Sequence, residues 1–538
     1  MTIGPPESRQ HMINSFQHVR FSSPAAVFTM AALSGFILFL CIPTIDWWIL
    51  AWIALVPVLL VVYDAPERMI AAGITFGFVA GIGKVYWITE TVVTYGGLNL
   101  LLGLLSMSIV AMLVGVYSLV FCIYVARTQW KRALFPLLAA SMWTALELLQ
   151  SYLFTGFPWE LLGYSQYKAL PMIQIANFAG VYGVSFVVVL VNATIAQVTI
   201  AVRDGMAWRP VVYSMMLTCA LFLGTAAYGF VTMAQIRSAE RQIAPLKVAI
   251  VQGSVEQGLK WSESMVQTTV DTYDELTRKI LPTAPDFIVF PETAMTFYLE
   301  ALSYRKQANE LYRLANDANA PILTGALGFR PDNRDIYNSA YMVGPGQGIV
   351  GKYSKMHLVP FGEYLPLSSL FWWLSGLSDD IGALTPGEFR SIMDVPGHDI
   401  RVGAVICYES IFPDEVRRFA ASGANVLVIM TNDAWFGTSS APMQHFSMAV
   451  LRAVESGVPV IRAANTGISG YISAMGQISG TTSLFERTTT SQVIKPGTDG
   501  VTFYAYYGDL FAYLCVLVAV CTLVWDSRRG RNENGTPS

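Results

Sequence analysis

Charged residues are scarce in this chain of 538 residues. Only 13% of the residues are Asp, Glu, Lys or Arg and 54% are hydrophobic, which is too apolar for an ordinary soluble protein of this length. The formal net charge is -3 and no basic stripe is interleaved with aromatic residues, so the sequence does not predict nucleic-acid binding. The scarcity of charge predicts a membrane protein.

Cysteine is also sparse, and no pair of cysteines suggests a disulfide framework or a zinc site. Five of the six cysteines lie in long apolar runs, where a thiol behaves as a small hydrophobic group. A Gly-rich phosphate loop is absent and the histidines show no metal-ligand spacing, so we expect neither a metal nor a nucleotide nor any other cofactor. Cys407 alone lies in the polar part of the chain.

Long hydrophobic runs, by contrast, are abundant. Crossing the hydrocarbon core takes about 20 apolar residues, and runs of this kind cover residues 25–43, 46–64, 69–89, 99–126, 132–152, 172–202, 210–233 and 503–525. We therefore expect a membrane α-helical bundle of eight transmembrane helices. Seven of them form a region over residues 1–233, and the last belongs to a final segment, 503–538, that ends in a cytoplasmic tail. Charged residues near the span ends, Lys84, Glu90 and Glu147, are expected to be interfacial anchors rather than catalysts.

Residues 234–502 have a different pattern and are expected to form one domain outside the membrane. Short continuous apolar runs, such as LKVAIVQG and NVLVIMTND, are typical of strands buried on both faces. Amphipathic helices are predicted at about 266–281, 304–318, 412–422 and 443–456. Strands that alternate with helices favour an α/β layered sheet, whose functional residues gather at the carboxyl ends of the strands.

The basic residues of the short loops predict the orientation of the chain. The loop with Arg127 and Arg132, the loop with Arg203 and Arg209, and the basic carboxyl-terminal tail fall on one side of an eight-span arrangement. The positive-inside rule assigns that side to the cytoplasm. Residues 234–502 would then lie on the periplasmic side of a bacterial inner membrane.

Polar residues follow the predicted strands at several places. Cys407 ends the strand in RVGAVICYES, and Glu292 comes directly after the strand in FIVFPET. Lys355 and Glu363 lie in the otherwise apolar segment GKYSKMHLVPFGEYLP. Taken singly, Cys407 fits a buried structural cysteine better than a nucleophile, and Glu292 fits a solvated turn carboxylate as well as a cleft residue. For Lys355 and Glu363, a surface charge pair is the weaker alternative. A nucleophilic Cys407 would need neighbours that favour its thiolate or take its proton.

Taken together and in this order, Glu292, Lys355 and Cys407 resemble the catalytic Glu-Lys-Cys triad of the nitrilase (carbon-nitrogen hydrolase) superfamily, over residues 245–490. The segments LVPFGEYLP, ICYES, TNDAWFG, LFTGFPW and GYSQ resemble, more narrowly, the apolipoprotein N-acyltransferase family. The resemblance implies an α/β nitrilase-like αββα sandwich domain. It also implies a ping-pong acyl transfer through a cysteine thioester.

The resemblance implies a role for each residue. Glu292 would be the general base, and Lys355 would supply positive charge for the thiolate and the oxyanion. The backbone N–H of Tyr408 is expected to be a second oxyanion donor. Glu363 resembles an additional essential carboxylate that would orient the lysine or the base. Glu409 also corresponds to a residue that the family needs, although the sequence does not define its role.

The substrates implied are both membrane residents. The acyl donor would be a phospholipid, expected to be phosphatidylethanolamine giving up its sn-1 chain, and the acceptor would be the α-amino group of a diacylglyceryl-cysteine on an apolipoprotein. We expect the protein to act as a monomer. One alternative is a membrane-anchored amidase that hydrolyses a small amide with the same triad. Another is a transporter or sensor with a degenerate nitrilase domain, which the intact triad disfavours.

Aromatic residues predict contact with lipid. Trp261, Trp372 and Trp373 lie in expected loops of the outer domain, and Trp159 lies in the GFPWE segment on the same side of the membrane. Interfacial aromatic side chains prefer the headgroup level, so these residues are candidates for substrate-contacting lids. The alternative is that the rings simply pack against the domain.

Overall fold

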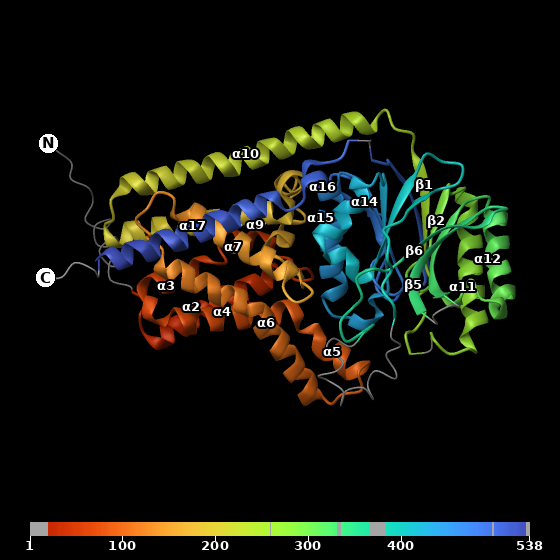
Figure 1. The fold of residues 1–538 in the computed structure, drawn as a ribbon, viewed down its shortest axis with the longest axis horizontal. Helices are drawn as coiled ribbons and strands as arrows, with labels where there is room; N and C mark the ends of the chain where they lie inside the picture. The colour runs from red at the N-terminus through yellow and green to blue at the C-terminus, as the bar shows by residue number, and fades with distance from the viewer. Residues whose placement is uncertain (1–19, 259, 331–334, 365–383, 498–499, 534–538) are drawn as a thin grey trace, which may run out of the picture. The chain divides into compact units, whose positions relative to one another are not determined.

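The computed structural model describes residues 20–258, 260–330, 335–364, 384–497 and 500–533. The chain divides into two compact units. The first comprises Met1–Ile175, Ala179–Phe230 and Asp509–Ser538, and the second comprises Ala176–Phe178 and Val231–Gly508. Figure 1 shows that the first unit is built from helices and the second from sheets and helices.

The first unit is helical because its sequence is a series of long apolar runs. The helices formed mainly by this unit are α2 (Pro24–Cys41), α3 (Val56–Asp64), α4 (Met69–Val85), α5 (Trp87–Thr94), α6 (Leu100–Arg127), α7 (Phe135–Tyr152), α8 (Leu170–Ile173), α9 (Ala176–Asp204), α10 (Trp208–Glu240) and α17 (Leu510–Glu533). Each of the eight predicted spans is largely helical in the structure.

Within the described part of the chain, five helical stretches are long and apolar enough to cross a membrane. They are Pro24–Cys41, Pro66–Val85, Leu100–Arg127, Ala176–Asp204 and Trp208–Glu240, and the apolar helices Trp48–Asp64 and Leu510–Trp525 are shorter. Helix α7 is not among them, because its polar side chains, which include Ser141, Thr144, Glu147 and Gln150, lower its mean hydropathy. The count of eight spans is therefore not confirmed.

Small residues allow α4 and α6 to approach closely. A Cβ atom on Gly77 would lie 2.3 Å from the carbonyl oxygen of Gly115, and one on Gly81 would lie 2.3 Å from that of Ala111. Each helix presents two small residues one turn apart, so the backbones meet along small-xxx-small stripes. A larger side chain at either glycine would push the two helices apart.

Glu147 lies inside the first unit and is only 5% exposed. Its Oε1 accepts hydrogen bonds from Trp143 Nε1 at 2.9 Å and from the Leu162 backbone N–H at 2.8 Å. The prediction of an interfacial anchor is therefore wrong for this residue. A buried carboxylate needs hydrogen-bond donors, and Glu147 uses its donors to hold the helical turn η3 (Leu162–Gln166) against α7.

The second unit contains two β-sheets. The first has the order β13-β1-β2-β4-β5-β6, with β3 paired to β4, and the second has the order β12-β11-β10-β9-β8-β7. The strands of the first sheet are β1 (Leu246–Gln252), β2 (Phe287–Val289), β3 (Met295–Tyr298), β4 (Ile322–Arg330), β5 (Asp335–Gly344), β6 (Gly348–Ser354) and β13 (Thr488–Ile494). Those of the second are β7 (Ile392–Asp394), β8 (Arg401–Ile406), β9 (Val426–Thr431), β10 (Val460–Ala464), β11 (Gly470–Ile472) and β12 (Ile478–Ser479).

Parallel pairing at the centre of each sheet brings strand ends together. β1, β2 and β4 are parallel neighbours, as are β8, β9 and β10. Ile406 at the end of β8 lies opposite Met430 of β9, which in turn lies opposite Ala463 of β10. The residues that follow these strands therefore share one edge of the sheet, as expected for a parallel arrangement.

Helices cover the outer face of each sheet (Figure 1). α11 (Met265–Ile280) and α12 (Arg305–Ala318) pack on the first sheet, and α14 (Pro413–Ala421) and α15 (Ala441–Ser456) pack on the second. The inner faces meet, and the Tyr471 hydroxyl of β11 donates a hydrogen bond to the Val248 carbonyl of β1. This four-layer arrangement confirms the predicted αββα sandwich.

Candidate active site

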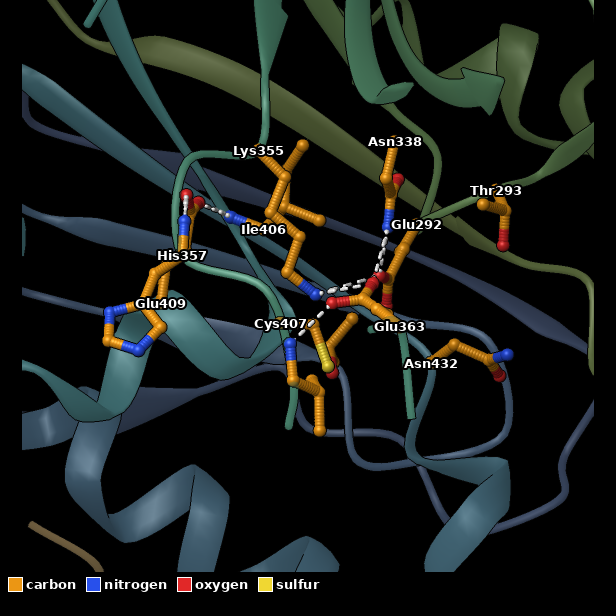
Figure 2. Close-up of polar contacts among 12 residues, drawn as sticks. Glu292, Thr293, Asn338, Lys355, His357, Glu363, Ile406, Cys407, Glu409 and Asn432 are labelled. Carbon is orange, nitrogen blue, oxygen red and sulfur yellow. Dashed lines mark hydrogen bonds and ion pairs between the residues drawn. The ribbon is translucent and has the colours of Figure 1, made fainter. Parts of the chain in front are cut away.

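Cys407 lies at the sharp turn where β8 ends and the helical turn η7 (Cys407–Ile411) begins. Its φ is 52°, in the left-handed region, which costs a non-glycine residue on the order of 1–3 kcal/mol. A strained strand-to-helix turn is a known way to present a nucleophile at the end of a strand. Figure 2 shows Cys407 in the group formed by Glu292, Lys355 and Glu363, and the charges of Glu292 and Lys355 act on its thiol.

Glu292 lies in the turn between β2 and β3 and is 6% exposed. Its Oε1 accepts a hydrogen bond from Asn338 Nδ2 at 2.7 Å and lies 3.8 Å from Lys355 Nζ. The next residue, Thr293, has a φ of 47°. A strained residue therefore directly follows Glu292, just as the strained Cys407 directly follows β8.

Lys355 follows β6 and its ammonium is buried between two carboxylates. Its Nζ lies 2.8 Å from Glu363 Oε1, and the other oxygen of Glu363 accepts a hydrogen bond from the Val359 N–H at 2.7 Å. The backbone N–H of Lys355 donates to the Asn338 carbonyl at 2.8 Å. Asn338 on β5 thus holds the lysine through its backbone and Glu292 through its side chain (Figure 2).

The charges and burial of this group keep Cys407 in its protonated thiol form, so a base must take the proton before the sulfur can attack. Burial, and next the charge of Glu292, raise the pKa of Cys407, and Lys355 offsets only part of this. Burial also raises the pKa of Glu292, against the lowering effect of Lys355. A carboxylate with a raised pKa is a better proton acceptor. Burial alone would lower the pKa of Lys355, but Glu363 and Glu292 raise it, so the ammonium stays charged.

Glu409 joins the Cys407 turn to the segment around Lys355. Its Oε2 accepts a hydrogen bond from the Ile406 N–H at 2.8 Å. Its Oε1 accepts hydrogen bonds from the Tyr353 hydroxyl and from the Met356 N–H, both at 2.7 Å. The side chain is 2% exposed. These contacts supply what the sequence left undefined, since Glu409 positions the backbone on both sides of the site.

Tyr408 is the second residue of η7. Its ring packs at a centroid distance of 5.5 Å from the His357 ring and 5.1 Å from the Phe412 ring, nearly perpendicular to both. These contacts fix the side chain beside Cys407. A role for its backbone N–H as an oxyanion donor stays a prediction.

The four predicted lid residues differ in their surroundings. Trp261 is 48% exposed, and a ring this accessible can contact a substrate. Trp159 is 2% exposed and packs against the Trp87 and Phe157 rings of the first unit, so it is a packing residue here and its role in substrate entry stays a prediction. Trp372 and Trp373 lie outside the described residues.

Sequence reasoning missed two polar residues that contact Glu292. Asn338 lies inside β5, where nothing in the sequence distinguishes it from an ordinary strand residue. Lys260 is 1% exposed, and its Nζ donates to Thr293 Oγ1 at 2.7 Å and to the Glu292 carbonyl at 3.3 Å. The only available signal was its place directly before Trp261 in a predicted loop.

A buried polar chain behind Cys407 was also missed. The Ser410 hydroxyl donates to the Cys407 carbonyl at 2.7 Å and shares a hydrogen bond of 2.7 Å with His445 Nε2. His445 Nδ1 lies 3.0 Å from Asp433 Oδ1, and Arg462 Nη2 donates to Asp433 Oδ2 at 2.8 Å. All four side chains are at most 1% exposed, so this chain supports the strained turn and does not contact substrate.

A thiol at a strand-to-helix turn, beside a buried carboxylate and a buried ammonium on an αββα sandwich, defines a site for nucleophilic chemistry at a carbonyl carbon. The family model for "Carbon-nitrogen hydrolase" matches residues 247–498, which contain this site. The family model for "Apolipoprotein N-acyltransferase N-terminal domain" matches residues 34–194. The second unit is therefore a nitrilase-fold domain.

Curated relatives cover nearly the whole chain. An apolipoprotein N-acyltransferase of Geobacter metallireducens is 38% identical over 518 residues, covering 94% of this chain and 96% of the relative. One from Pasteurella multocida is 31% identical, covering 90% and 92%. One from Haemophilus influenzae is 30% identical, covering 93% and 95%. The chain belongs to the apolipoprotein N-acyltransferase family.

Among solved structures, the nitrilase-superfamily protein Nit3 of Saccharomyces cerevisiae covers 47% of this chain and 90% of its own, at 18% identity and a TM-score of 0.37. The family assignment rests on the sequence relatives and not on this likeness.

Proposed function

We propose that this protein transfers a fatty acyl chain from a phospholipid to the α-amino group of a diacylglyceryl-cysteine at the amino terminus of an apolipoprotein. The expected donor is the sn-1 chain of phosphatidylethanolamine. The observation that carries the proposal is the buried Lys355 ammonium bridging Glu292 and Glu363 beside Cys407, in a chain of the apolipoprotein N-acyltransferase family.

In the first half-reaction, the Cys407 sulfur attacks the ester carbonyl carbon of the donor while Glu292 accepts the thiol proton. A C–S bond forms, and the oxyanion is stabilised by the Lys355 ammonium and the Tyr408 backbone N–H. The ester C–O bond then breaks, and the leaving glycerol oxygen takes the proton back from Glu292. The products are a lysophospholipid and a thioester on Cys407.

In the second half-reaction, the amine of the acceptor attacks the thioester carbonyl and Glu292 accepts a proton from it. An amide forms, the C–S bond breaks, and the proton passes to the departing Cys407 sulfur. The same carboxylate serves in both directions, as microscopic reversibility permits. Donor and acceptor therefore use one site in turn, which is a ping-pong mechanism.

Placement in the bacterial inner membrane fits these substrates. Withdrawing an acyl chain from the bilayer costs about 0.8 kcal/mol per CH₂ exposed, so a membrane-anchored enzyme avoids a large penalty. We infer from the loop charges that the domain over residues 234–502 faces the periplasm. The helices of 1–233 and the final helix of 503–538 would anchor it.

The amidase alternative differs in the acceptor, because water and not an amine would attack the thioester. The curated relatives described above are N-acyltransferases, so the comparisons do not favour the amidase. Purified protein incubated with phosphatidylethanolamine carrying a labelled sn-1 chain and a synthetic diacylated lipopeptide should yield a labelled triacylated lipopeptide. Release of the label only as free fatty acid, with no label on the peptide, would reject the transferase in favour of a hydrolase.

A further inference from the structure

Lys260 is a buried cation for which the mechanism above has no use. It is 1% exposed, and the oxygens that accept its hydrogen bonds among the described residues, Thr293 Oγ1 and the Glu292 carbonyl, are neutral. Its Nζ also lies 5.8 Å from the centroid of the Trp261 ring. Among the described residues no carboxylate is in direct contact with this ammonium, and a buried charge is costly unless nearby charges of opposite sign offset its desolvation.

The charge balance of the site identifies that need. Glu292 and Glu363 are two carboxylates that flank the single ammonium of Lys355. With Lys355 alone, the buried group would carry one uncompensated negative charge, and one carboxylate would tend to take up a proton. Lys260, in the segment that follows β1, supplies a second positive charge and contacts the turn that carries Glu292.

We propose that Lys260 is a positioning residue for the acylation reaction, one that keeps Glu292 ionised as the general base and fixes the turn that carries it. This role deepens the proposed function and rests on it. The hydrogen bond to Thr293 holds a residue whose φ is 47°, which sets the direction of the adjoining Glu292 side chain toward Asn338 and Lys355.

The directions in which the charges shift the pKa values of Lys260 and Glu292 agree with this geometry. Burial lowers the pKa of Lys260 to about 8, and the charge of Glu292 limits the decrease, so the ammonium persists at neutral pH. Among the described residues, the charged groups that act most on Glu292 are Lys355 and Lys260, which lower its pKa, and Glu363, which raises it. Removing Lys260 therefore raises the pKa of the base, and removing Glu363 lowers it.

The test is the pH dependence of Cys407 alkylation by iodoacetamide, followed by mass spectrometry of the Cys407 peptide in the purified full-length protein. The rate should rise as Glu292 becomes ionised and able to take the thiol proton. In Lys260→Gln, which keeps a hydrogen-bond donor but loses the charge, the inflection should move up by at least about one pH unit. Because of that shift, alkylation should be about tenfold slower below the inflection, and the wild-type rate should be recovered at higher pH.

Matched variants separate charge from shape. Lys260→Arg keeps the charge and should keep the wild-type inflection, and Lys306→Gln, at an exposed lysine, should leave the whole profile unchanged. Lys260→Gln combined with Glu363→Gln removes one charge of each sign, so its inflection should return toward the wild-type value. The double variant also keeps the test informative if Lys260→Gln alone fails to fold from charge imbalance.

A Lys260→Gln profile that superimposes on the wild type would overturn the proposal. So would equal shifts in Lys260→Gln and Lys260→Arg, because shape and not charge would then matter. The alkylation readout does not depend on the lipid reaction. If the shift occurs but wild-type protein forms no acyl-enzyme with phosphatidylethanolamine, the electrostatic role of Lys260 stands and the proposed function fails.

Discussion

The Lys355 ammonium lies 2.8 Å from Glu363 and 3.8 Å from Glu292, so the lysine is bound more closely to the second carboxylate than to the proposed base. Glu363 is in turn held by the Val359 N–H. This arrangement leaves Lys355 oriented by Glu363 and leaves Glu292 free to exchange a proton with the thiol.

Glu363→Gln should therefore slow acylation by on the order of 10²-fold or more, because Lys355 loses the anion that orients it. Glu363 also raises the pKa of Glu292, so its removal should move the acidic limb of the pH–rate profile to lower pH. The measurement is the rate of acyl-enzyme formation against pH. An acidic limb that moves to higher pH would contradict this electrostatic assignment.

Glu409 should matter for stability and activity together. Glu409→Ala leaves the Ile406 and Met356 N–H groups and the Tyr353 hydroxyl without their acceptor, at about 1–3 kcal/mol for each buried donor. Tyr353→Phe removes only one of these hydrogen bonds and should cost no more than about 3 kcal/mol. Thermal unfolding in detergent compares the two variants, and an equal loss of stability in both would show that Glu409 does not join the two segments.

Asp433 should make the catalytic domain sensitive to acid. Burial alone would raise the pKa of Asp433, but Arg462 and His445 lower it to about 2, below its usual value of about 3.9. Because the pKa is lower in the folded state, this carboxylate stabilises the fold above about pH 4, and the stabilisation is lost as the pH falls toward 2.

Asp433→Asn should cost about 3–5 kcal/mol at neutral pH, since it leaves the Arg462 guanidinium buried without its anion. The variant should also lose less stability than the wild type between about pH 4 and pH 2. Unfolding midpoints measured across that range test both points, with Asp317→Asn at an exposed carboxylate as the control. Parallel acid profiles for Asp433→Asn and the wild type would exclude Asp433 as the source of the sensitivity.

The orientation inferred from loop charge can be tested with introduced cysteines. A membrane-impermeant maleimide added to cells with a permeable outer membrane should label Lys279→Cys, whose side chain is 62% exposed on α11. It should not label Arg209→Cys, in the first turn of α10, until the inner membrane is opened. The reverse pattern would place the catalytic domain in the cytoplasm.

The parts of the site that the sequence predicted are those that follow strands. Cys407 directly follows β8, Glu292 comes three residues after β2, and Lys355 directly follows β6. A break from apolar to polar residues at a strand end is visible in a single sequence, and in parallel sheets such ends meet. The buried strands and the four amphipathic helices are predictable for the same reason, because a continuous apolar run and a helical periodicity are both local patterns.

The missed residues owe their roles to contacts distant in sequence. Asn338 and Glu292 are 46 residues apart, and Ser410 and His445 are 35 apart, so no local pattern joins them. Buried polar residues within the first unit also explain why the count of eight spans is not confirmed. Glu147 and its polar neighbours make α7 less apolar than a lipid-facing helix. The sequence predicts an interfacial anchor at Glu147 because its hydrogen bonds with Trp143 and Leu162 become apparent only in the fold.

The most direct test of the mechanism is intact-mass spectrometry of the purified protein after incubation with phosphatidylethanolamine of one defined sn-1 chain. The wild type should gain the mass of one acyl group, which maps to the Cys407 peptide, is released by hydroxylamine and disappears when a diacylated lipopeptide is added. Cys407→Ala and Glu292→Gln should fold and gain no mass. An acyl adduct that persists in Cys407→Ala, or an adduct on wild-type protein that the lipopeptide does not remove, would contradict acyl transfer through this cysteine.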